Sequence, residues 1–272
     1  RSSDLDWDDA YANSAHVPGS DALPARWAER AAAYRAGLKS FKADIAYGSG
    51  ERQRLDLILP DGDSKGLVVF VHGGYWMRFD KSSWTDLAEG ARSHGWTVAL
   101  PSYTLAPAAR ISDITAEIAG AIASAAAQVS GPIRLVGHSA GGHLVTRMLC
   151  DDSRLEPEVY DRIVATLSIS GLHDLRPLLK TAMNGTLRMN MGEAALESAA
   201  LHLPRGKSPL TTWVGRSERP EFIRQAELMA NIWTGFDVPT HLVVDPGHNH
   251  FTVVDGLKDP SSAITRCLLG LA

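Results

Sequence analysis

The chain has 272 residues, of which 44% are hydrophobic and 21% charged, as in an ordinary globular protein with a sizeable core. A formal net charge of −4 gives no excess of basic residues that would bind nucleic acid. No apolar run reaches the roughly 18 residues needed to span a membrane. Cys150 and Cys267 are the only cysteines, which gives no disulfide framework or metal-ligand spacing and favours a reducing compartment, the cytoplasm.

The first 40 residues are expected to be an N-terminal helical extension of a single domain spanning residues 1–272. The opening letters RSSDLDWDDAYANS are acidic and polar and lack the apolar core of a signal peptide. The stretch ALPARWAERAAAYRAGLKS is rich in alanine, with Pro24 near its start and Gly37 placed to end it. This pattern predicts a helix.

Strand and helix patterns alternate over the rest of the chain. Strands are predicted from RQRLDLILP, KGLVVFVHGG, GWTVALPSY, GPIRLVG, RIVATLSISG, SPLTTWVG and VPTHLVVDPGHNH. Helices are predicted from KSSWTDLAEGARSHG, ISDITAEIAGAIASAAAQVS and SSAITRCLLGLA. The alternation predicts an α/β fold with a mainly parallel sheet flanked by helices on both faces. The less regular stretch 175–207 is predicted to form a small cap over the site.

A serine stands between two glycines where a buried strand gives way to a helix. Gly137-His138-Ser139-Ala140-Gly141 fits the pattern Gly-x-Ser-x-Gly in the context that gives this motif its meaning. Glycines relieve the crowding of a tight turn that presents the serine hydroxyl at the helix N-terminus. We therefore predict that Ser139 is a nucleophile; the alternative is a Gly-Ser turn that arose by chance.

A second glycine-rich loop follows an upstream buried strand. Gly73 and Gly74 can present backbone N–H groups without obstructing side chains, and the N–H of Ala140 supplies another donor in hydrolases of this architecture. We expect these groups to form an oxyanion hole. The alternative is a loop that only lets strand and helix pack closely. His72 is expected to anchor the loop.

The expected order in the chain is serine, acid, histidine. His248 and His250 both lie in the loop DPGHNHF after the last strand, and we favour His250 as the base, with His248 in reserve. Glu218 lies in the exit loop of the preceding strand and is the favoured acid. The competing carboxylates are Asp174, interpreted as a helix cap, Asp245, close in sequence to the histidine, and Glu221, interpreted as a solvated helix residue.

Taken together, these residues resemble the α/β-hydrolase superfamily from about residue 45 to the C-terminus. The stretches HGGYW and GHSAGGHL are similar to those of the kynurenine formamidase (arylformamidase) group and its HGG-motif esterase relatives, and SPL, PEFIRQ and HF add to the likeness. In that group the acid precedes the Pro-Glu-Phe element and the base precedes a phenylalanine. The resemblance maps these roles to Glu218, where the group usually has aspartate, and to His250.

The resemblance implies acyl transfer through a covalent intermediate on Ser139, with no metal or organic cofactor. The expected partners are a small-molecule substrate, first an aryl formamide, and a second copy of the chain in a homodimer. Tyr75, Trp76 and Tyr103 follow strand ends and are expected to face an aromatic ring, unless they serve ordinary packing. The alternatives are a broad carboxylesterase for short acyl esters and a non-catalytic binding protein on a hydrolase scaffold.

Overall fold

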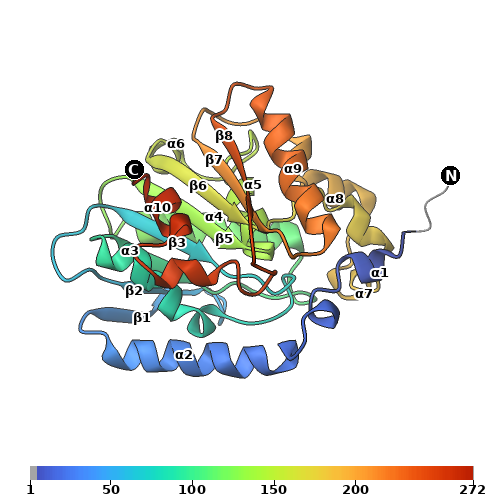
Figure 1. Cartoon of the computed structure of the whole chain (residues 1–272). Coiled ribbons are helices and arrows are strands. Elements are labelled where there is room, and N and C mark those ends of the chain that lie inside the picture. Colours follow the sequence, from blue (N-terminus) through green and yellow to red (C-terminus); the bar gives the residue numbers. More distant parts are fainter. Residues whose placement is uncertain (1–4, 272) are drawn as a thin grey trace.

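The computed structural model describes residues 5–271; residues 1–4 and 272 of the predicted domain lie outside this part. One sheet with the strand order β1-β2-β4-β3-β5-β6-β7-β8 forms the centre of the molecule (Figure 1). The strands are β1 (Phe41–Ala46), β2 (Arg54–Ile58), β3 (Leu67–Val71), β4 (Thr97–Pro101), β5 (Ile133–His138), β6 (Ile163–Ile169), β7 (Leu210–Gly215) and β8 (Thr240–Asp245). β2 pairs antiparallel with both of its neighbours, β1 and β4, and all other neighbouring strands pair parallel. The sheet is therefore mainly parallel, which confirms the predicted fold class.

Helices cover both faces of the sheet, with α4, α5 and α9 on one face and α2, α3 and α10 on the other (Figure 1). The α-helices are α1 (Trp7–Ala10), α2 (Leu23–Gly37), α3 (Glu89–Ser93), α4 (Ile111–Ala126), α5 (Ala140–Arg147), α6 (Pro157–Tyr160), α7 (Asn184–Leu187), α8 (Met191–Leu196), α9 (Pro220–Thr234) and α10 (Ala263–Leu269). The 3₁₀ turns are η1 (Ser14–His16), η2 (Ser20–Ala22), η3 (Lys81–Ser83), η4 (Thr85–Ala88), η5 (Arg176–Lys180), η6 (Ala199–Leu201) and η7 (Asp255–Lys258). None of the described helices combines the length and apolar character needed to cross a bilayer.

The apolar strands divide their side chains between two cores. Val69 and Val71 of β3 pack in the core beneath α4, α5 and α9, whereas Val68 and Phe70 pack in the core beneath α3 and α10. This follows from the two-residue period of a strand, which sends successive side chains to opposite faces. A fully buried apolar run such as β3 is therefore typical of a central parallel strand.

Three elements differ from the sequence prediction. β1 was not predicted, because most of its side chains are exposed and it lies at the sheet edge, so it carries no apolar pattern. The helix predicted from KSSWTDLAEGARSHG is divided into η3, η4 and the short α3. The stretch 175–207 contains only short turns of helix, η5, α7, α8 and η6.

The N-terminal extension is part of the core rather than an appendage. Trp27 of α2 is buried, and its ring lies 4.8 Å from that of Trp84 and 5.8 Å from those of Phe79 and Phe251. Ala31 on the same face has no exposed surface. Burial of this aromatic cluster fixes α2 against the loops at one end of the sheet.

Candidate active site

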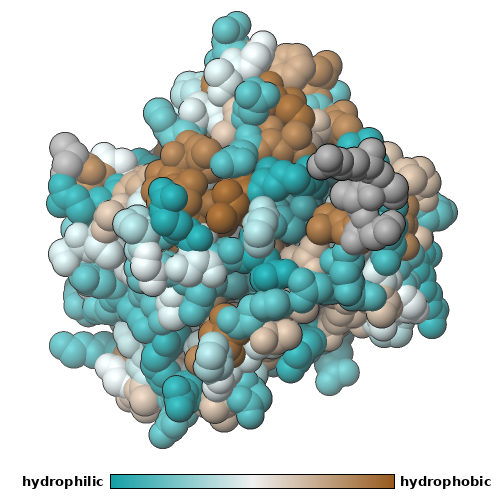
Figure 2. All heavy atoms as spheres, turned by 45° about the vertical axis from the view of Figure 1, so that its right-hand side comes forward, coloured by the Kyte–Doolittle hydropathy of each residue, from teal (hydrophilic) through white to brown (hydrophobic). Residues whose placement is uncertain are grey.

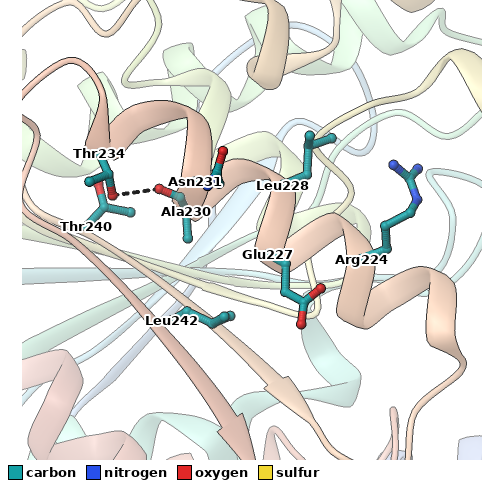
Figure 3. Close-up of a pocket in the computed structure, with 8 residues that line it drawn as sticks. All are labelled: Arg224, Glu227, Leu228, Ala230, Asn231, Thr234, Thr240 and Leu242. Carbon is teal, nitrogen blue, oxygen red and sulfur yellow. Dashed lines mark hydrogen bonds between the residues drawn. The ribbon is translucent and has the colours of Figure 1, made fainter.

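The candidate site is a cavity of about 610 Å³ lined by Ser139 and His250 together with Gly73, Gly74 and Tyr75. These residues follow the carboxyl ends of β3, β5 and β8, where parallel sheets gather functional groups. Another hollow, of about 650 Å³, lies between α9 and β8 and is lined by residues such as Arg224, Glu227 and Leu242 (Figure 3). Its lining contains no serine, cysteine or histidine, so chemistry and not volume identifies the first cavity as the candidate site.

Ser139 is held in a strained backbone conformation with φ 57° and ψ −117°. A Cβ on Gly137 would lie 2.1 Å from the carbonyl oxygen of Gly141, and one on Gly141 would lie 1.9 Å from that of Val71. The turn therefore requires both glycines. The Ser139 N–H donates to the carbonyl of Ile169 at 2.8 Å, which ties the turn to β6. This geometry is that of a strand-turn-helix nucleophile.

The imidazole of His250 is paired with the carboxylate of Glu218, with 2.7 Å between Nδ1 and Oε2. Both side chains are buried. The other carboxylate oxygen, Oε1, accepts hydrogen bonds from the Gly215 N–H at 2.8 Å and the Ser170 hydroxyl at 2.5 Å. Because an ionised carboxylate only accepts, Nδ1 carries a proton, and in the neutral form of the ring Nε2 then has the lone pair.

Ser170 is a residue of the candidate site that the sequence analysis missed. It has a φ of 51° directly after β6, and its hydroxyl donates to Glu218. A serine at the carboxyl end of a central strand was the available signal, but nothing in the sequence ties it to a glutamate in another loop.

The competing residues are engaged elsewhere. His248 Nδ1 lies 3.3 Å from the Thr252 hydroxyl, and Asp245 accepts a hydrogen bond from the Trp213 indole at 2.9 Å. Asp174 pairs with the guanidinium of the nearby Arg176. None of these three candidates lines the cavity. The geometry thus pairs His250 with Glu218 and with no other acid among residues 5–271.

The described residues do not form a hydrogen bond with the Ser139 hydroxyl. Ser139 and His250 both line the cavity. Such contacts are often long before a substrate binds.

The loop of Gly73 and Gly74 lies directly against the serine turn. A Cβ on Gly73 would lie 2.9 Å from the Cβ of Ser139, and Gly74 has a φ of 109° that glycine readily adopts. Ala140 is the first residue of α5, and the first N–H groups of a helix lack partners within it. The predicted oxyanion donors are therefore gathered around Ser139.

Two aromatic residues expected in the site support this loop from inside, so the prediction that they face the substrate was wrong. Tyr103 stacks on His72 at 4.4 Å between ring centroids and donates to the His72 carbonyl at 3.0 Å. The Trp76 indole donates to Nδ1 of His143 at 3.3 Å. Both are fully buried and neither lines the cavity. The chain turns back with positive φ at Tyr75 and Trp76, which leaves only Tyr75 on the cavity side.

His72 anchors the loop as expected. Its Nδ1 donates to the Gly73 carbonyl at 2.7 Å, and burial lowers its pKa to about 4. The ring is therefore neutral near pH 7 and acts as a hydrogen-bond donor, not as a charged group.

The cover of the cavity comes from the N-terminal extension and not from the stretch 175–207, which corrects the predicted cap. The lining residues of the extension are Tyr11, Ala12, Asn13, Ser14, Ala15, Ser20, Asp21, Pro24 and Trp27. The stretch 175–207 contributes no lining residue. It packs beside α5, where Glu197 is buried against Arg147 and Thr115.

Tyr11 fastens this N-terminal cover at two places. Its carbonyl accepts a hydrogen bond from the Tyr75 hydroxyl at 2.6 Å, and its own hydroxyl donates to Glu221 at 2.7 Å. Glu221 is buried, so its interpretation as a solvated helix residue was wrong.

Figure 2 shows the face of the molecule on which α1 and α8 lie. Hydrophilic residues on this face separate several hydrophobic patches.

Among residues 5–271, one cluster of side chains of the kind that bind metals lies outside the cavity, formed by Asp151, Asp152 and His202. Arg147 already makes two hydrogen bonds with Asp152, and Nε2 of His202 pairs with the Leu196 carbonyl at 2.7 Å. Ion pairing and hydrogen bonding account for this cluster.

Comparison with known proteins places the chain among hydrolases. A model described as "Alpha/beta hydrolase family" matches residues 68–265. The kynurenine formamidase of Danio rerio is 28% identical over 271 residues, which cover 90% of this chain and 92% of the relative. That of Salmo salar is 28% identical and covers 86% of this chain and 82% of the relative.

Two solved structures extend the comparison. A candidate thioesterase from a Silicibacter species is 45% identical, with a TM-score of 0.93 over 97% of this chain and 99% of that one. An esterase of Pyrobaculum calidifontis is 16% identical, with a TM-score of 0.69 over 92% of this chain and 91% of that one, a likeness of fold alone.

Proposed function

The chain belongs to the alpha/beta hydrolase family, and from that premise we propose that it is a serine hydrolase that cleaves a small amide or ester through an acyl-enzyme. The observation that carries the proposal is the pairing of His250 with Glu218 at 2.7 Å in the cavity that Ser139 lines. Glu218 is buried, and its carboxylate accepts hydrogen bonds from Ser170, Gly215 and His250, which supports its role in orienting the imidazole.

In the first half-reaction, His250 Nε2 takes the proton of the Ser139 hydroxyl as the oxygen attacks the substrate carbonyl carbon. The tetrahedral oxyanion accepts hydrogen bonds from the N–H groups of Gly73, Gly74 and Ala140. The intermediate collapses when the bond to the leaving group breaks. His250 returns its proton to the departing amine or alcohol, and the acyl group remains on Ser139.

In the second half-reaction, His250 removes a proton from water as the water oxygen attacks the acyl-enzyme. Collapse of this second tetrahedral intermediate breaks the bond to the Ser139 oxygen, which regains the proton from His250. The carboxylic acid leaves and the enzyme returns to its starting state. Glu218 remains ionised and stabilises the imidazolium that forms in both halves.

Aryl formamides are the substrate class we put first. The similarity to kynurenine formamidases over most of the chain supports this choice. The cavity wall also includes the rings of Trp27, Tyr75 and Phe251, which suit an aromatic leaving group. A second candidate is an esterase or thioesterase acting on short acyl groups, favoured by the Silicibacter likeness.

A substrate panel tests the proposal. The purified protein and its Ser139→Ala variant are assayed on N-formylkynurenine, p-nitrophenyl acetate and an acetyl thioester. We expect the highest kcat/KM on the formamide and none of the activities in the variant. Fast ester or thioester cleavage with negligible formamide cleavage would move the assignment to the second candidate, and full activity of the variant would refute serine catalysis.

The cytoplasm remains the compartment we propose. Cys150 is buried and Cys267 half-buried, and both are unpaired thiols, which is the state that a reducing compartment preserves.

A further inference from the structure

We propose that His138, the residue before the nucleophile, is a positioning residue that holds the base loop of His250 in register with Ser139. This inference rests on the proposed function. His138 is the last residue of β5, so its backbone continues directly into the strained serine turn. Its side chain is buried, and the residue is part of the cavity lining.

The contact that carries the inference joins His138 to the backbone of the base. Nε2 of His138 lies 2.8 Å from the carbonyl oxygen of His250. A carbonyl only accepts, so Nε2 carries the proton, which fixes the tautomer of His138. Within residues 5–271 this is the only donor to the His250 carbonyl. The position of the base therefore depends on a residue joined to the nucleophile.

The ring of His138 also packs against the ring of the base. The ring centroids of His138 and His250 are 4.8 Å apart, and Phe222 lies 4.5 Å from His250. Glu218 occupies Nδ1 of the same imidazole. With rings against it and an acid on Nδ1, the imidazole of His250 has little freedom to rotate.

A third element meets His138 on its other side. A Cβ on Gly73 would lie 2.8 Å from the His138 carbonyl oxygen and 3.5 Å from its Nδ1. His138 thus contacts the serine turn, the oxyanion loop and the base loop. Replacing it alters the spacing of the base and the nucleophile without removing either one.

His138 is suited to this role because it stays neutral. Burial, and then the positive charge of a protonated His250, lower its pKa well below the ordinary value. A neutral donor does not oppose the imidazolium that forms on His250 during each turnover. The catalytic charge is therefore confined to His250 while His138 keeps one tautomer.

The test uses a pair of variants of similar length that differ in the donor. In His138→Gln the amide N–H can replace Nε2–H, whereas His138→Met fills the space without a donor. We expect kcat to fall about 10- to 100-fold in the methionine variant with KM changed less than about threefold, because small misplacements of catalytic groups cost this much. The glutamine variant should recover most of kcat.

Labelling by a fluorophosphonate probe separates this inference from the proposed function. The second-order labelling rate at Ser139 should follow kcat across wild type, His138→Gln and His138→Met, with His241→Gln on the exposed edge strand as the control of unchanged rate. Equal kcat in the glutamine and methionine variants, or a loss that appears only in KM, would overturn the role of His138. Failure of the probe to label the wild-type enzyme would instead refute serine catalysis.

Discussion

Glu218 has one methylene more than the aspartate usual in the formamidase group, and its surroundings match the extra length. One carboxylate oxygen meets His250 while the other accepts from Ser170 and the Gly215 N–H. A carboxylate bound at both oxygens cannot be shortened or neutralised without loss of a contact. A substitution of Glu218 that keeps the size of the side chain but removes its charge therefore tests the role of the charge alone.

We expect Glu218→Gln to lower kcat by about 10³- to 10⁴-fold, because a neutral amide neither selects the tautomer of His250 nor stabilises its imidazolium. Steady-state kinetics on the best substrate measure the effect, and the melting temperature checks the fold. Asp245→Asn is the matched control, since this acid bonds to Trp213 outside the cavity. A larger loss in the control than in Glu218→Gln would reassign the acid.

The two histidines of the base loop should respond differently. His250→Ala is expected to lower kcat by about 10⁴-fold or more, because no other general base lines the described cavity with an orienting acid. His248→Ala removes only the contact with Thr252 and should change kcat less than about tenfold. Kinetics of both variants on one substrate decide the matter, and the reverse order would make His248 the base.

At the scale of elements, the parallel strands and the three candidate catalytic residues could be predicted from sequence for physical reasons. Buried strands such as β3 consist of apolar residues without interruption, and a Cβ on Gly137 would lie 2.1 Å from the Gly141 carbonyl oxygen within the serine turn itself. Local constraints of this kind leave a pattern in the chain. Edge strand β1 has no such constraint and left no pattern.

The cover of the cavity could not be predicted because its constraints are tertiary. Tyr11 contacts Glu221 and Tyr75, which are far away in sequence, and its neighbours in the chain give no sign of either partner. The predictions that Trp76 and Tyr103 face the substrate were wrong for a related reason. An aromatic residue after a strand end can fill the space beneath a loop as well as face a ligand.

We expect Tyr11→Phe to loosen this cover. The change leaves the buried Glu221 without one hydrogen bond, which costs about 1–3 kcal/mol of unfolding free energy, and it should raise KM more than it lowers kcat. Tyr34→Phe is the matched control, because its hydroxyl also bonds to a glutamate, Glu89, but does not line the cavity. An equal KM in both variants would contradict a role of the cover in substrate binding.

At the scale of the whole molecule, buried neutral histidines should govern the response to acid. Burial lowers the pKa of His72 to about 4 and of His143 and His173 to about 3, and that of His138 falls well below its ordinary value. Below about pH 6.5 the unfolded chain binds protons that the folded chain does not. The unfolding free energy should therefore decrease as the pH falls from 6.5 to about 4.

The measurement is denaturant unfolding between pH 7 and pH 4. Each such histidine contributes up to about 1.4 kcal/mol per pH unit to the slope. His173→Gln, at a position outside the candidate cavity, should make the slope shallower whatever the stability of the variant at pH 7. A slope unchanged in this variant would show that His173 does not remain neutral in the folded state.

The central claim is that Ser139 acts as a nucleophile that His250 and Glu218 activate. The most direct measurement is mass spectrometry of the intact protein and its peptides after reaction with a fluorophosphonate. The account predicts one adduct, located on Ser139, that forms quickly in the wild-type enzyme, at least about 100-fold more slowly in His250→Ala, and not at all in Ser139→Ala. An adduct on another residue, or equal labelling of Ser139 with and without the His250 imidazole, would contradict it.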